Sequence, residues 1–91
     1  SVGEALGQTG GMVRIEGHTD NVPIAFSERF RSNWDLSSAR SASVANFLLD
    51  NTPVEPGRVT ITGFADSKPI ADNNTPDGRA KNRRIEVIVD G

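Results

Sequence analysis

The chain has 91 residues, 35% of them hydrophobic and 24% charged, a composition typical of one small globular domain. Ten basic and twelve acidic residues leave a net charge of −2, so no overall basic field favours nucleic acid or an anionic membrane surface. The absence of cysteine excludes disulfides and thiolate chemistry, and no apolar run reaches the ~20 residues of a membrane span.

The first predicted element is the end of a helix at residues 1–8, which Gly10 and Gly11 would terminate. Because the chain opens inside this helix, we expect it to be a piece excised from a longer protein. Residues 12–17 (MVRIEG) alternate between apolar and polar side chains. This alternation predicts a half-buried strand.

A long connection over residues 21–33 follows the strand, and its aromatic residues Phe26 and Phe30 predict that it is packed down. The clearest helical pattern then covers residues 36–51, with Ser37 as the expected N-cap. Four residues at helical spacing are predicted to face the core: Ser41, Val44, Phe47 and Leu48.

Residues 58–63 form a second alternating pattern and predict a strand with Val59 and Ile61 facing inward. The Pro, Asp and Asn content of residues 65–74 predicts a loop.

A short helix is predicted from Pro76 to Asn82, with Thr75 as its N-cap. Residues 84–89 predict a third strand, whose apolar density indicates a central or well-covered position. Helices and strands therefore alternate along the chain. This order predicts an α+β fold, with helices packed on one face of a mixed sheet.

Two charged residues have the most informative positions. Arg40 falls in the first turn of the predicted helix, where a cation opposes the helix dipole, so an anion bound there would explain it. Its guanidinium matches a carboxylate bidentately, whereas the alternative is a structural salt bridge to Asp20 or Asp35. Asp20 follows a strand and either receives an ammonium or caps a turn. Together they predict a receptor for a small zwitterion.

The remaining polar signals are weaker. His18 is the only histidine, and we expect it to be a hydrogen-bonding strut on the polar face of its strand. Without a second histidine or a cysteine there is no zinc-site pattern, and nothing marks a serine as a nucleophile. Four basic residues form a small cluster that is either solvated and paired with acids or partly turned toward a ligand: Arg79, Lys81, Arg83 and Arg84.

Four segments, in the same order, resemble the OmpA-like peptidoglycan-binding domain. They are GHTDN at 17–21, NWDLSSAR at 33–40, RVTITGFADSKPI at 58–70 and NNTPDGRAKNRRIEV at 73–87. TDNVPI, the extended loop after it and FRSNWDLSSAR are most similar to the flagellar stator B branch of the family, the MotB type. Ser41 stands where alanine is usual.

This resemblance implies a mixed sheet with helices on one face, lacking its usual first strand in this chain, with residues 1–11 as a remnant of the first helix and loop. It also implies binding of the diaminopimelate residue of peptidoglycan stem peptides. By position, Asp20 matches the acid that pairs with the ligand ammonium, and Arg40 matches the arginine that binds its carboxylate. The other matched positions are the pocket-lining Arg83, the framing residues Asn33 and Leu36, and the weaker wall positions Thr19 and Phe64.

The resemblance further implies a non-catalytic anchor in the periplasm, with no cofactor or metal and no nucleic-acid partner. The full-length protein is expected to form a homodimer, to carry an inner-membrane helix outside this chain and to have a MotA-like membrane partner. The alternative is a structural or dimerisation domain with little ligand binding of its own. A hydrolase acting on peptidoglycan is a third, less favoured hypothesis.

Overall fold

The computed structural model describes residues 11–24 and 30–90. The helix end expected at residues 1–8, and Phe26 in the long connection, lie outside the described residues. The elements are β1 (Met12–His18), α2 (Asn33–Asn51), the short 3-10 helix η1 (Pro56–Arg58), β2 (Val59–Gly63), α3 (Pro76–Asn82) and β3 (Arg84–Asp90).

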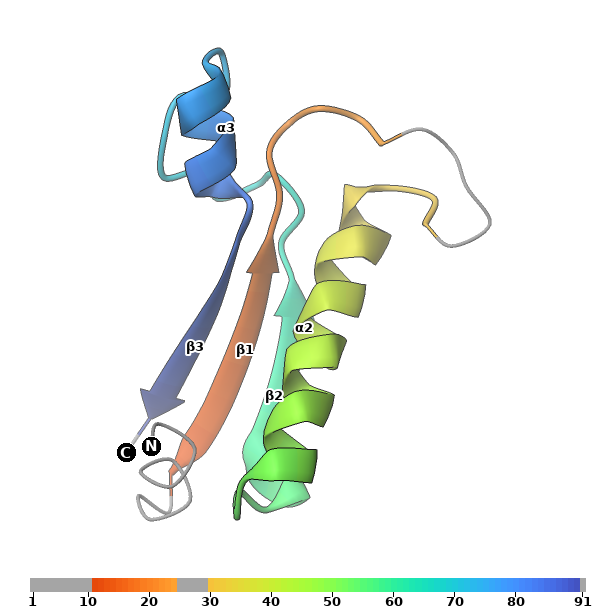
Figure 1. The fold of residues 1–91 in the computed structure, drawn as a ribbon, viewed down its shortest axis with the longest axis vertical. Helices are drawn as coiled ribbons and strands as arrows, with labels where there is room; N and C mark the ends of the chain where they lie inside the picture. The colour runs from red at the N-terminus through yellow and green to blue at the C-terminus, as the bar shows by residue number, and fades with distance from the viewer. Residues whose placement is uncertain (1–10, 25–29, 91) are drawn as a thin grey trace.

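The three described strands form one mixed sheet in the order β2-β1-β3, with β1 parallel to β2 and antiparallel to β3 (Figure 1). Helix α2 runs along one face of the sheet, whereas α3 lies beyond its end, next to the start of β3. The predicted α+β class is therefore confirmed. The central or well-covered position predicted for residues 84–89 is wrong among the described strands, because β1 lies between the other two and β3 exposes part of its apolar side chains.

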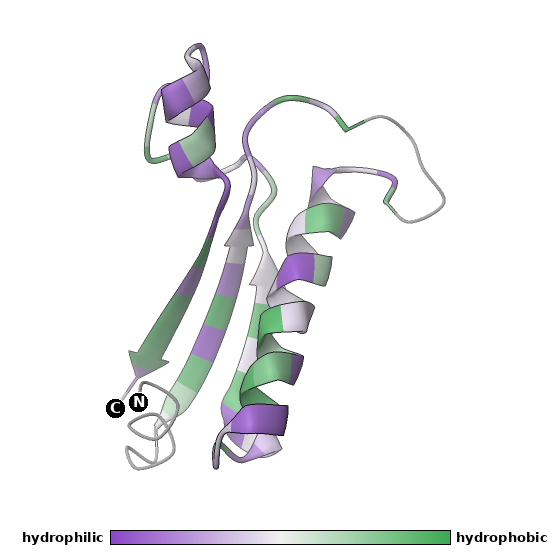
Figure 2. Ribbon diagram, in the orientation of Figure 1, coloured by the Kyte–Doolittle hydropathy of each residue, from purple (hydrophilic) through white to green (hydrophobic). Residues whose placement is uncertain are grey.

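Strand β3 is apolar along much of its length (Figure 2), yet its Val87 and Val89 are 42% and 39% exposed. Its register pairs these residues with Ile15 and Val13 of β1, so their side chains share the face that α2 covers. The apolar density of a segment predicts that the strand has a buried face. It does not predict whether the strand lies at the centre or at the edge of the sheet.

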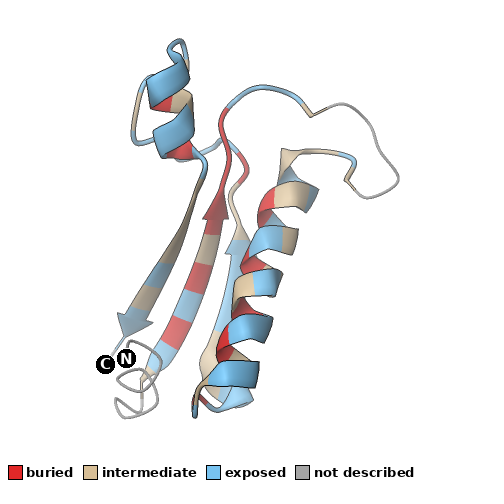
Figure 3. Cartoon of the chain, viewed as in Figure 1, coloured by how far each residue is buried: buried red, intermediate tan, exposed pale blue. Residues whose placement is uncertain are grey.

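The core lies between β1 and α2, where the inward residues of β1 are buried (Figure 3). Val13 and Ile15 are 0% exposed, as the alternating pattern predicted. The core is completed by three further buried residues: Ala45, Leu48 and Val54. Two predictions were wrong, because Phe47 is 64% exposed and Ile61 is 44% exposed.

The buried side of α2 begins with small residues rather than large apolar ones. Ser37 and Ser41 are both 0% exposed and lie against the sheet. A Cβ added at Gly17 of β1 would lie 2.6 Å from Ser41 Oγ and would clash with the Ser37 carbonyl oxygen, and one at Gly63 of β2 would lie 2.7 Å from Ser37 Oγ. The helix can therefore approach both strands closely only because each has a glycine there.

Helix α2 begins earlier than predicted. Its N-cap is Ser32, whose hydroxyl accepts a hydrogen bond from the Asp35 N–H at 3.5 Å, and not Ser37. The Ser37 hydroxyl instead donates to the Trp34 carbonyl and accepts from the Ala65 N–H, at 3.2 and 3.0 Å. It therefore joins α2 to the segment after β2.

The segment between β2 and α3 is held by Asn82, which is 0% exposed. The Asn82 Oδ1 accepts hydrogen bonds from the Ile70 and Ala71 N–H groups at 2.7 and 3.0 Å. Its Nδ2 donates to the Ala71 carbonyl and to Asn73 Oδ1 at 3.0 and 2.7 Å. Helix α3 begins as predicted, with the Thr75 hydroxyl accepting from the Gly78 N–H at 3.0 Å.

His18, at the end of β1, is 2% exposed and stacks on Phe64, with ring centroids 5.1 Å apart. Its Nε2 lies 3.3 Å from Glu86 Oε2, but neither ring nitrogen makes a hydrogen bond with the described residues. The prediction of a hydrogen-bonding strut was therefore wrong. Burial, and then the nearby charge of Arg84, lower the pKa of His18, although Glu86 acts in the opposite direction.

Replacing Gly17 with alanine is expected to lower the free energy of unfolding by at least ~2 kcal/mol, since overpacking outweighs the better strand propensity of alanine. Gly57→Ala is the matched control, because a Cβ there meets nothing within 4 Å. Urea denaturation of both variants measures the difference. Equal stabilities would contradict the close approach of α2 to the sheet.

His18 is expected to make stability depend on pH. Its folded pKa is lowered, so the unfolded chain binds the proton first as the pH falls below ~6.5, and the free energy of unfolding decreases from there down to the folded pKa. His18→Gln should flatten this part of the profile in urea denaturation at several pH values. An NMR titration that places the His18 pKa at or above ~6.5 would contradict the expectation.

Candidate functional site

Asp20 lies two residues beyond β1, and its side chain is 10% exposed. Its Oδ2 pairs with Arg83 Nη1 at 2.8 Å, and its Oδ1 accepts a hydrogen bond from the Val22 N–H at 3.0 Å. The carboxylate therefore caps the turn after β1 and joins it to Arg83, the residue between α3 and β3. Each oxygen accepts one bond from the described residues, which leaves acceptor capacity on both.

Arg40 lies two turns into α2, because the helix begins at Asn33. The argument that Arg40 opposes the helix dipole was therefore wrong, since that effect is confined to the first turn. The side chain is exposed and forms no ion pair or hydrogen bond within the part of the chain that the structure describes. The salt bridges considered for it, to Asp20 or Asp35, are not formed.

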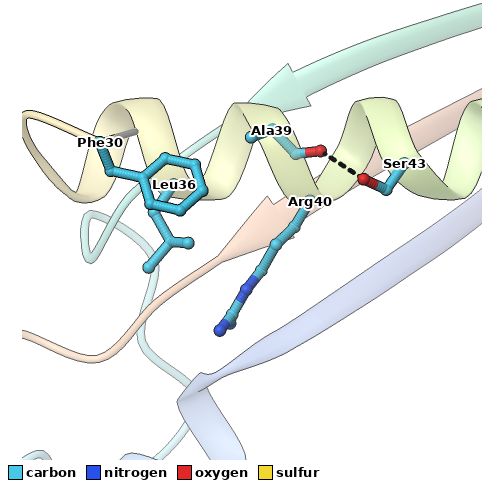
Figure 4. A pocket seen from close by; sticks show the side chains of 5 residues that line it. All are labelled: Phe30, Leu36, Ala39, Arg40 and Ser43. Carbon is cyan, nitrogen blue, oxygen red and sulfur yellow. Dashed lines mark hydrogen bonds between the residues drawn. The ribbon is translucent and has the colours of Figure 1, made fainter. Parts of the chain in front are cut away.

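Arg40 lines a hollow of about 550 Å³ along the side of α2. The other lining residues are Phe30, Leu36, Ala39 and Ser43 (Figure 4). In this view Leu36 and Arg40 extend from the same side of the helix, with Phe30 beside Leu36. The hollow thus combines an apolar wall with a guanidinium that no described residue pairs with. Asp20 is not among its lining residues.

Asn33, the first residue of α2, connects the helix to the segment after β1. Its Nδ2 donates to the Val22 carbonyl at 3.1 Å and to the Asp20 carbonyl at 3.4 Å. Asn33 and Arg40 are seven residues apart and share one face of α2. Asp20 is therefore held at the N-terminal end of the helix face that carries Arg40.

Thr19 and Phe64 hold the ends of β1 and β2 together next to Asp20. Thr19 is 4% exposed, its hydroxyl donates to the Asp20 carbonyl, and its N–H donates to the Ala65 carbonyl, both at 2.8 Å. The Phe64 N–H donates to the Gly17 carbonyl at 2.9 Å, and Lys68 Nζ lies 4.5 Å from the centre of its ring. Both residues fix the two strand ends against each other.

Ala65 joins these strand ends in a conformation that alanine rarely adopts. Its φ is +52°, in the left-handed region, and the residue is 1% exposed. Its N–H and carbonyl both bond to neighbouring elements, through Ser37 and Thr19. These bonds hold the strained backbone in place.

Within residues 11–24 and 30–90, three of the four basic residues in the sequence cluster have partners. Arg83 pairs with Asp20, Arg84 Nε pairs with Glu86 Oε2 at 2.7 Å, and Arg79 Nη1 donates to the Asn73 carbonyl at 3.0 Å. The Arg83–Asp20 pair was not predicted, because 63 residues separate its members. Only the folded chain brings them together.

The structure therefore divides the predicted site residues into groups. Asp20, Arg83 and Asn33 are joined by hydrogen bonds, Arg40 and Leu36 line the neighbouring hollow, and Thr19 and Phe64 support the strand ends. Their roles toward a ligand stay predictions.

Across residues 11–24 and 30–90, no cluster of three or more His, Cys, Asp or Glu side chains could hold a metal ion. Among the same residues, no helix has both the length and the apolar character to cross a membrane.

Comparison with known proteins supplies the family. The sequence pattern of the OmpA family matches residues 2–83. Motility protein B of Bacillus subtilis (strain 168) is 44% identical over 75 residues, which are 82% of this chain and 28% of that protein. The peptidoglycan-binding protein ArfA of Mycobacterium bovis is 42% identical over 77 residues, 85% of this chain and 22% of that protein.

A solved structure, the cell wall anchor of the T6SS from Pseudomonas aeruginosa, has a TM-score of 0.84 and 44% sequence identity. The match covers 94% of this chain and 59% of that one. The chain thus spans less than a third of the two curated relatives. These matches confirm the resemblance predicted from the sequence motifs, and the chain belongs to the OmpA family.

Proposed function

We propose that this chain is a non-catalytic peptidoglycan-binding module that binds the diaminopimelate residue of stem peptides. The observation that carries the proposal is the guanidinium of Arg40, which has no partner among the described residues and lines a hollow on the same face of α2 as Asn33. A cation without a partner, beside the apolar Leu36, is suited to an anionic ligand that carries some apolar chain.

The ligand chemistry follows from the two charges. A free amino-acid centre carries an ammonium and a carboxylate on one carbon. Arg40 binds the carboxylate through its planar fork, and Asp20 accepts the ammonium with the acceptor capacity that Arg83 and Val22 leave. Asn33 holds Asp20 in position, and no chemical step is required of any of these groups.

The names of similar proteins support this assignment. One relative is named a peptidoglycan-binding protein, and one similar structure is a cell wall anchor. We extend the proposal to the whole protein as an anchor of a cell-envelope complex in the periplasm, the flagellar stator being our first candidate because of the likeness to Motility protein B. A homodimer and a MotA-like membrane partner belong to the same proposal.

A second candidate is a structural or dimerisation domain with little ligand binding of its own. One observation favours it: Asp20 is already paired with Arg83 and does not line the hollow of Arg40. The two candidates differ in whether a stem peptide binds at all.

Arg40→Ala is expected to abolish binding of a diaminopimelate-containing stem peptide in an NMR titration. Removing one member of a desolvated charge pair typically costs ~2–5 kcal/mol of binding free energy. The free energy of unfolding of this variant should stay within ~0.5 kcal/mol of the wild-type value, since the side chain is exposed and has no partner among the described residues. Lys81→Ala, which removes an exposed cation from α3, is the control for net charge. Retained binding in Arg40→Ala would reject its assignment, and a wild-type spectrum that never moves would favour the structural candidate.

Asp20→Asn is expected to weaken both folding and binding. It removes the ionic partner of the half-exposed Arg83, which is worth about 1 kcal/mol after solvent screening, and the acceptor for the ligand ammonium. Denaturation and the same NMR titration separate the two effects. A variant that is destabilised but binds normally would restrict Asp20 to a structural role.

A further inference from the structure

His18 is a buried titratable residue that takes no part in the proposed contacts with the ligand. It is 2% exposed at the end of β1, and neither ring nitrogen makes a hydrogen bond with the described residues. A neutral imidazole carries one N–H donor, whereas a protonated imidazole carries two. Taking up a proton therefore buries a positive charge and a second donor at a place where no described residue accepts a hydrogen bond from the ring.

The charged groups around His18 come from three segments of the chain. Arg84 and Glu86 lie on β3, where Arg84 is the direct register partner of His18. Glu16 lies two residues earlier on β1, and Lys68 belongs to the segment after β2. Strand β2 carries no charged side chain, and α2 packs on the opposite face of the sheet. Burial, followed by the charge of Arg84, lowers the pKa of His18 despite the two acids.

Glu86 is shared between His18 and Arg84. Its Oε2 lies 3.3 Å from His18 Nε2 and 2.7 Å from Arg84 Nε. A protonated His18 competes with Arg84 for this oxygen and repels the guanidinium, because both are then cations on neighbouring strands. Arg84 Nη2 also donates to the Lys68 carbonyl at 3.0 Å. A charge on His18 therefore weakens the hydrogen bond that ties the segment after β2 to β3.

The same segment is connected to the candidate site. Phe64 stacks on the His18 ring, with ring centroids 5.1 Å apart. The carbonyl of the next residue, Ala65, accepts the Thr19 N–H at 2.8 Å. The Thr19 hydroxyl in turn donates to the Asp20 carbonyl at 2.8 Å. A displacement of the segment beside His18 thus reaches the backbone of Asp20 through two hydrogen bonds.

We propose that protonation of His18 lowers the affinity of the site for its zwitterionic ligand, so that the domain releases the cell wall in mildly acidic solution. The neutral ring, stacked on Phe64, belongs to the arrangement that binds. The charged ring favours an arrangement in which Glu86 turns from Arg84 to His18 and the segment after β2 shifts. This proposal rests on the proposed function, because it assigns a regulator to the same site. By linkage, a bound ligand must also disfavour the proton on His18.

The first test is an NMR titration of the wild-type chain with the diaminopimelate-containing stem peptide at several pH values between 7.5 and 5. The affinity is expected to fall roughly 5-fold or more over this range, the low end of typical coupling between sites. The amide spectrum at each pH shows whether the chain is folded, which separates lost binding from unfolding.

Two variants accompany the wild type in this titration. His18→Phe keeps an aromatic ring against Phe64 but cannot be protonated, so its affinity should stay constant over the same range. Glu55→Gln is the matched control, because it removes an exposed carboxylate before η1, at the other end of β2 from Phe64. It should show the same pH dependence as the wild type.

The second test measures the pKa of His18 directly. His18 is the only histidine, so its ring signals are unambiguous in NMR spectra. A 5-fold loss of affinity on protonation requires that saturating peptide lower the pKa of His18 by about 0.7, because the coupling is reciprocal. A purely structural role would leave this pKa unchanged by the peptide. The measurement needs no variant, so it carries the test if His18→Phe fails to fold.

The outcomes separate the two proposals. A wild-type affinity that is constant from pH 7.5 to 5 would overturn the role of His18 and leave the peptide site intact. An equal loss of affinity in His18→Phe, or a His18 pKa that the peptide does not lower, would do the same. Failure of the wild type to bind the peptide at pH 7.5 would overturn the proposed function, and the role of His18 with it.

Discussion

The close approach of α2 to the sheet is the constraint on which the rest of the structure depends. Gly17 and Gly63 leave room for the helix, and the serine hydroxyls facing them form hydrogen bonds where a bulkier apolar stripe would not fit. Ser41 bonds to the Thr62 carbonyl at 2.9 Å, and Ser37 bonds to Ala65. These bonds fix both the distance of α2 from the sheet and its position along it, and with them the placement of every site residue on the helix.

Much of the fold could be predicted, because its local signals agree with its tertiary structure. The alternation of β1 and the Thr75–Pro76 start of α3 needed no knowledge of distant contacts. The buried face of α2 was predicted only in part, because Ser41 and Leu48 are buried as expected whereas Phe47 is exposed. Hydropathy treats serine as polar, so Ser37 was taken for a cap and Phe47 for a core residue, whereas the glycines of the sheet select small residues at the contact.

The residues of the candidate site were selected from motifs and from local electrostatics, and their roles toward a ligand are still predictions. Asp20 and Arg40 were selected as a pair, but the dipole argument for Arg40 failed once the helix proved to begin at Asn33. The partner of Asp20 could not be predicted, because Arg83 reaches it from the far end of the chain. Motifs propose which residues belong to a site, whereas tertiary contacts decide which of them pair in the folded chain.

The two hydrogen bonds of Asn33 have a consequence for how this domain can vary among its relatives. They tie Val22 and Asp20 directly to the first turn of α2, so both ends of the connecting segment are fastened at one point. Residues inserted or deleted between those ends change the closure entropy only slowly with length and leave the flanking geometry in place. Evolution can therefore lengthen or shorten this segment, and equip it for new contacts, without moving the neighbouring site.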